Sequence, residues 1–140
     1  MYQKDYILRM IEMLGDLLAA IFGLIKKGDY KRASEQLGKI YYDMLKEDAA
    51  FFRAIPADEL THKLLKEHNY TNDHLEILAE LFNVEAELDL AQGNRPGCLE
   101  YTTKSLILFE FIDNEQRTYS LARTEKMNAI KRRIETLRAE

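Results

Sequence analysis

Apolar residues recur every three or four positions along most of the chain, which is the period of an amphipathic α-helix. The longest stretch covers residues 4–27, where Met10, Leu14 and Leu18 follow this spacing. From Leu17 to Ile25 every side of the expected helix is apolar, so we expect this half to be buried all round. The pattern predicts a first helix whose second half lies inside the protein.

Glycine and polar residues mark the next boundaries. Gly28 suits the left-handed residue that ends a helix, and Asp29 can cap a following helix over residues 30–46. Residues 47–56 are apolar enough to pack as a short helix. A short amphipathic helix is then expected over residues 58–68.

The second half of the chain repeats this plan. A helix over residues 72–92 ends at Gly93, and Pro96 suits the first turn of the next helix. Asp113 is then expected to cap a last helix over residues 115–137. The pattern predicts an all-α protein of about six helices, stacked as antiparallel hairpins.

Composition favours one helical domain over residues 1–140. Of the 140 residues, 46% are hydrophobic and 31% are charged, and there are only two Pro and six Gly. The apolar run 17–25 is far shorter than the roughly 20 residues that cross a bilayer. Glu12 and Asp16 argue against a secretory signal. These features predict a cytoplasmic protein with no membrane partner.

Charge is divided unevenly along the chain. Residues 1–114 carry 13 Lys and Arg against 20 Asp and Glu, whereas residues 115–140 carry seven against four. The acidic majority argues against nucleic acid as a partner, because phosphate binding needs a basic surface. The basic last helix, by contrast, can dock on acidic surface elsewhere in the fold.

The most uneven segment runs from residue 67 to residue 94, which holds seven acidic residues and no Lys or Arg. On a helix Glu76, Glu80 and Glu87 fall on one face, and Glu85 and Asp89 form a second pair. Like charges at this spacing repel each other by roughly a few tenths of a kcal/mol per pair. Either the basic last helix or an outside partner is therefore expected to offset the repulsion.

Two short turns carry a family resemblance. Residues 28–30 form a Gly-Asp-Tyr turn followed by the small residue Ala33, and residues 93–95 form a Gly-Asn-Arg turn followed by Cys98. These hairpins resemble tetratricopeptide units, and their glycines lie 65 residues apart, close to two periods of the roughly 34-residue repeat. Residues 47–70 depart from the repeat. The opening QKDYILRMIEML also resembles that of small bacterial proteins without assigned function.

The resemblance supports a helical array and implies no specific function. The absence of Lys and Arg between residues 67 and 94 motivates the hypothesis of a non-enzymatic interaction module. The first helix of each tetratricopeptide pair lines a concave groove, where Glu80, Asn83, Glu87 and Leu90 would lie in the second pair. The Lys and Asn clamps that hold a peptide's terminal carboxylate in some members are absent, so an acidic groove should prefer a basic segment. We expect a protein or peptide partner on the face of Glu76, Glu80, Asn83 and Glu87.

The alternative is that these acids form a solvated face or pair with cations within the chain. The cations expected to do so are Arg117, Arg123, Lys126 and Lys131. Such pairing would leave the acidic face without an outside partner.

A further interpretation concerns self-association. In the first helix the groove-lining positions would be Leu18, Phe22 and Ile25, which are all apolar. Either the rest of the chain covers them or a second subunit does, since an exposed apolar patch of this size marks an interface. A homodimer that pairs through the first helix is therefore an open alternative.

Residues with catalytic chemistry are few. Glu59 and His62 form a single Glu-x-x-His, a motif that di-iron bundles use twice, and His68 and His74 miss the spacings of zinc proteases. Cys98 is more simply a packing residue than an activated thiol. We expect no catalytic residue, no metal and no cofactor. A metalloprotein built around Glu59 and His62 is the remaining enzymatic alternative.

Overall fold

The computed structural model of the protein describes residues 2–116 and 120–139, with side chains from residue 8 onward. Every regular element in these ranges is helical, so the expected all-α fold is confirmed. The elements are α1 (Tyr2–Lys26), α2 (Tyr30–Leu45), α3 (Ala49–Arg53), η1 (Ala57–Glu59), α4 (Leu60–His62), η2 (Lys63–Glu67), α5 (Asn72–Ala91), α6 (Arg95–Gln116) and α7 (Leu121–Ala139).

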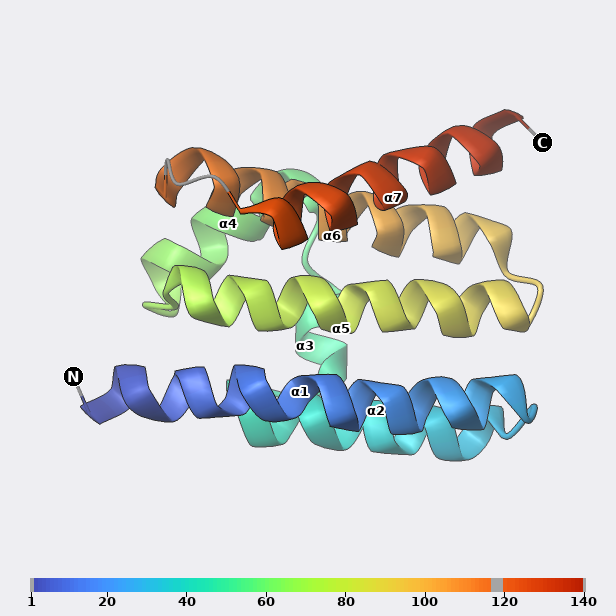
Figure 1. Ribbon diagram of the computed structural model, residues 1–140, viewed down its shortest axis with the longest axis horizontal. Coiled ribbons are helices and arrows are strands. Elements are labelled where there is room, and N and C mark those ends of the chain that lie inside the picture. Colours follow the sequence, from blue (N-terminus) through green and yellow to red (C-terminus); the bar gives the residue numbers. More distant parts are fainter. Residues whose placement is uncertain (1, 117–119, 140) are drawn as a thin grey trace.

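Two helical hairpins and a final helix form the layers of the fold (Figure 1). α1 pairs with α2, α5 pairs with α6, and α7 packs along α6. α5 lies in the middle, because it also packs against both α1 and α2. Its side chains Leu75, Leu78 and Phe82 are fully buried. The acidic residues of α5 are therefore carried by a helix that is enclosed on most of its sides.

The two glycine turns form as predicted. Gly28 has a φ of +82° and Gly93 a φ of +81°, a region that glycine enters without steric cost. The side chain of Asp29 accepts a hydrogen bond from the backbone N–H of Arg32 at 3.4 Å, which caps α2. These residues fix where each hairpin reverses direction.

The connection between the hairpins is helical but irregular. Within α3, Phe52 is fully buried and its ring stacks on that of Tyr41 at 5.6 Å between centroids. The single helix expected over residues 58–68 is instead a succession of a 3-10 turn, a short α turn and a π turn. Leu60 and Leu64 are still fully buried, as their spacing predicts.

The boundary between α6 and α7 differs from the prediction. Asp113 does not cap the last helix, because α6 continues past it to Gln116. Ile112 is buried and keeps this turn of α6 on the core, while the Asp113 carboxylate accepts a hydrogen bond from Arg123 Nε at 3.2 Å. Ser120 marks the start of α7, since its hydroxyl oxygen accepts from the N–H of Arg123 at 3.2 Å. The predicted last helix also includes residues 117–119, which lie outside the described residues.

The second half of α1 also differs from the prediction. Leu18, Ile21 and Ile25 point into the core, but Leu17 and Phe22 each keep 37% of their surface exposed. The expectation of burial all round is wrong. Two helices, α2 and α5, pack on α1, and they cover only part of its circumference. α1 therefore presents apolar side chains to solvent.

Candidate functional site

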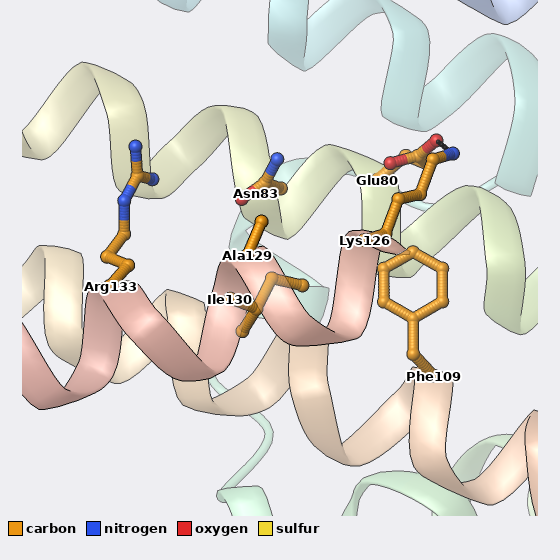
Figure 2. A pocket seen from close by; sticks show the side chains of 7 residues that line it. All are labelled: Glu80, Asn83, Phe109, Lys126, Ala129, Ile130 and Arg133. Atoms are coloured by element: carbon orange, nitrogen blue, oxygen red, sulfur yellow. Dashed lines mark hydrogen bonds and ion pairs between the residues drawn. The ribbon is translucent and has the colours of Figure 1, made fainter. Parts of the chain in front are cut away.

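A hollow of about 200 Å³ lies between α5 and α7. Figure 2 shows that its lining comes from α5, from Phe109 of α6 and from α7. We call this hollow the α5–α7 groove, and it is lined by Glu80, Asn83, Phe109, Lys126, Ala129, Ile130 and Arg133. Two of the residues that the sequence suggested for partner binding, Glu80 and Asn83, thus lie in one concave site.

The groove exists because α7 packs on α6 rather than on α5. Ile130 and Ile134 are buried at 5% and 8% exposure and set the side of α7 that faces the core. Within the described chain α5 and α7 are not a closely packed helix pair, so long side chains make most of the contact between them. A strip of space is left between the two helices.

Two ion pairs cross the groove. Lys126 Nζ binds Glu80 Oε2, and Arg133 Nη2 binds Glu87 Oε1. Lys126 Nζ also lies 6.0 Å from the centre of the Phe109 ring, which is a cation–π contact. The first ion pair is drawn in Figure 2, where Arg133 also extends from α7 toward α5. α7 therefore neutralises the acidic face of α5 at two points.

Both ion pairs are partly open to water, and their carboxylates Glu80 and Glu87 are 19% and 31% exposed. The side chain of Lys126 is 48% exposed and that of Arg133 is 27% exposed. Partial burial lowers the pKa of the Arg133 guanidinium. Because water still reaches these partly buried pairs, each is expected to contribute about 1 kcal/mol or less to stability. Another cation can therefore take the place of Lys126 or Arg133 with little loss of folding free energy.

Glu76 lies one helical turn before Glu80 and does not line the groove. Burial raises the pKa of its carboxyl, while Lys126 and Arg123 lower it and Glu80 raises it further. Within the described part of the chain no Lys or Arg forms an ion pair with Glu76. The repulsion expected along this face is therefore offset at Glu80 and Glu87 but not fully at Glu76.

The four cations expected to pair with the acidic face have different positions. Lys126 does pair with it, as described above. Arg123 is buried and lies beside Asp113 of α6 instead. Lys131 is exposed on α7, and Arg117 lies outside the described residues. Of the three described cations in this set, Lys126 forms the internal ion pair with the acidic face that the sequence left open.

Arg133 is the charged groove residue that the sequence analysis did not name. A signal for it was present, because Lys126 and Arg133 are seven residues apart on α7, as Glu80 and Glu87 are on α5. Seven residues make two turns of an α-helix, so matched spacings allow two parallel contacts between neighbouring helices. Comparing the spacing of opposite charges on different helices would have identified it.

The residues suggested for self-association separate in the structure. Leu18 and Ile25 belong to the core of the described chain, whereas Phe22 is exposed. A second hollow, of about 340 Å³, lies between α1 and α2. Other large apolar side chains exposed on α1 are Leu8, Met13 and Leu17.

A different face of α5 holds a buried polar cluster. The Glu85 side chain is 5% exposed, accepts a hydrogen bond from the Tyr41 hydroxyl at 3.0 Å and pairs with Arg53 Nε at 2.6 Å. Burial and the nearby Glu85 carboxylate raise the pKa of Tyr41 well above its ordinary value. Burial, followed by Glu85, also raises the pKa of Asp89. The Glu85 carboxylate is thus buried and bonded to two partners within the protein, although the Arg53 side chain is 35% exposed.

The residues considered for catalysis are not gathered into a site. Glu59 and His62 are both exposed. Among the described residues, no three His, Cys, Asp or Glu side chains lie close enough together to hold a metal ion. Cys98 is buried, and burial raises the pKa of its thiol, which disfavours the reactive thiolate.

Comparison of the sequence with models of known protein families gives no match, and neither curated proteins nor solved structures show significant similarity to the chain. In the described ranges no helix has the length and apolar character needed to cross a membrane.

Proposed function

We propose that this protein is a non-enzymatic interaction module that binds a basic or amphipathic segment of another protein at the α5–α7 groove. The docking surface comprises Glu76, Glu80, Asn83 and Glu87 of α5. One observation carries the proposal: carboxylates of α5 already bind basic side chains that a helix presents to them. A basic segment of a partner would make contacts of the same kind.

A tetratricopeptide-like array is the fold that we propose for this module. Two features support it: left-handed glycines turn both hairpins, and α5 packs against both helices of the preceding hairpin. The irregular segment 49–67 interrupts a regular repeat, so the likeness concerns the two hairpins alone. A bacterial origin and a cytoplasmic location stay predictions.

A defined basic helix tests the proposed function. A synthetic peptide that copies residues 121–139 carries six Lys and Arg against two Glu. The labelled peptide is titrated with the full-length protein and binding is followed by fluorescence anisotropy. We expect the double variant Glu80→Lys plus Glu87→Lys to bind at least about tenfold more weakly than wild type, because it replaces attraction by repulsion.

The control for this experiment reverses two other acidic residues. Glu12 and Glu35 are exposed on α1 and α2, and changing both to Lys alters the net charge by the same amount. This control variant is expected to retain most of the binding. Equal weakening in both variants would reduce the effect to overall charge and remove the proposed docking surface.

Self-association is a second candidate function, favoured by the exposed apolar residues of α1. Leu17 and Phe22 would pack against a second copy of the chain. Sedimentation velocity over a concentration series would then show a dimer that Leu17→Ser plus Phe22→Ser converts to monomer. A monomer at every concentration of the wild type would eliminate this candidate.

A further inference from the structure

The contacts of α7 with α5 have a simple repeat. Lys126 and Arg133 bind Glu80 and Glu87 at positions two helical turns apart, about 10 Å along each axis. Between the two ion pairs, Ile130 of α7 borders the hollow. On α7 the order is thus cation, apolar residue, cation at spacings of four and three.

The contacts that hold α7 against α5 are weak. Its buried residues are Arg123, Ile130 and Ile134, and Arg123 is engaged with Asp113 of α6. On the α5 side it forms the two ion pairs of Lys126 and Arg133, which water partly reaches. The cations of α7 can therefore leave the carboxylates of α5 while Ile130 and Ile134 keep the helix packed.

We infer that α7 is a resident competitor for the acidic face of α5, and that the partner is a helix of another protein presenting two cations seven residues apart with an apolar residue between them. This inference rests on the proposed function. The partner's cations replace Lys126 and Arg133 on Glu80 and Glu87, and its apolar residue enters the groove beside Phe109. Charge complementarity selects a basic helix for this place, because α5 lines the groove with Glu80 and Asn83 and binds the lining residue Arg133 through Glu87.

The competition has a measurable consequence. A binding site that is occupied by the chain itself for most of the time shows a weaker apparent affinity, in proportion to the fraction that is free. Removing the two resident cations frees the carboxylates without touching α5. The protein should then bind a basic helix more tightly, while every residue of α5 is unchanged.

The experiment compares two double variants of the full-length chain. Lys126→Ala plus Arg133→Ala removes the resident cations, and Lys131→Ala plus Arg132→Ala removes the same charge from the exposed side of α7. The probe is the labelled peptide copying residues 121–139. We expect the first variant to bind about tenfold more tightly than wild type, the gain from freeing two exposed ion pairs. The control variant should show less than about a third of that gain.

A second probe tests the spacing of the cations. In one altered peptide the residues copying Lys126 and Arg133 are alanine, and in the other those copying Lys131 and Arg132 are alanine. We call the Lys126→Ala plus Arg133→Ala protein the opened variant. Only the first altered peptide is expected to lose tight binding to it, because that peptide lacks the two cations that would bind Glu80 and Glu87. The two peptides have equal net charge, so net charge does not distinguish them. Equal loss with both peptides would overturn the cation spacing as the recognition element.

The outcomes separate the two proposals. Equal peptide affinity of wild type and the opened variant would overturn the competition while leaving the proposed function standing. Absence of binding to either protein would remove both. If the opened variant forms a dimer in the absence of peptide, a second copy of the chain occupies the groove. That result would overturn the inference that the partner is another protein. Circular dichroism checks each fold, and Lys126→Gln plus Arg133→Gln, which keeps the aliphatic stems, replaces an alanine variant that unfolds.

Discussion

Two sets of carboxylates on α5 differ in what surrounds them. Glu85 lies against the buried Tyr41 and the partly exposed Arg53, with its own side chain 5% exposed. Glu80 and Glu87 lie toward α7 and meet cations whose side chains remain in contact with water. The same residue type, within eight positions of one helix, thus occupies two different environments.

The difference teaches which acidic residues are available for binding. A buried carboxylate has lost its hydration, so it depends on its protein partners and their removal is strongly destabilising. An exposed carboxylate can replace a partner by water or by a ligand at little cost. Glu85 therefore depends on its two partners, whereas Glu80 and Glu87 are the carboxylates that we propose to exchange partners.

The largest expected effect comes from breaking the buried pair. Arg53→Met should lower the free energy of unfolding by about 3 kcal/mol, because Glu85 is left buried with only the Tyr41 hydroxyl. This is the lower end of the usual range, since the Arg53 side chain is 35% exposed and water reaches the site. Urea unfolding followed by circular dichroism measures the change.

A double variant serves as the control for that prediction. Arg53→Met combined with Glu85→Gln removes the buried charge together with its partner and should recover most of the lost stability. A loss below about 1 kcal/mol in Arg53→Met alone would show that the Glu85 carboxylate behaves like an exposed one. The contrast between the two faces of α5 would then disappear.

The exposed pairs should matter much less for stability. Lys126→Ala and Arg133→Ala are each expected to lower the free energy of unfolding by less than about 1 kcal/mol. Lys131→Ala, at an exposed position of the same helix, gives the baseline for removing a charge from α7. Losses as large as that of Arg53→Met would mean that the groove pairs hold the fold together and do not exchange.

The smallest effect concerns Glu76, whose pKa is raised chiefly by burial. Because the pKa of the carboxyl is raised in the folded state, the protonated group stabilises the fold at pH values below its ordinary pKa. This contribution is lost as the pH rises through the raised pKa. Glu76→Gln should therefore match wild type in acid and exceed it in stability at neutral pH. Urea unfolding at several pH values tests this, and a variant less stable than wild type at neutral pH would contradict it.

Much of the fold could be predicted from the sequence. The apolar period located α1, α2 and α5 to within two residues, and Gly28 and Gly93 located the hairpin turns. These features are local, because helix period and turn conformation depend on neighbouring residues. The end of α6 was misplaced for a related reason: Asp113 has the character of a cap, but a partner from α7 satisfies it inside a helix.

Prediction of the site was less complete. The sequence indicated that acidic residues of α5 share a face, and Glu80 and Asn83 do line the groove. It did not distinguish the buried Glu85 from the partly exposed Glu80 and Glu87, because burial depends on which helices pack against each face. Arg133 was missed for the same reason, since its partner Glu87 lies 46 residues away in the chain.

The sequence by itself determined that the chain is helical, where its hairpins turn, and that its acidic and basic residues are concentrated on different helices. Only the tertiary structure decided that α7 packs on α6 and reaches α5 through two cations, and that Phe22 stays exposed while Leu18 does not. Local patterns fix dihedral angles and helix faces, which are short-range properties. Burial and charge pairing depend on how distant segments pack, and these two properties separate the structural carboxylate of α5 from those proposed to bind a partner.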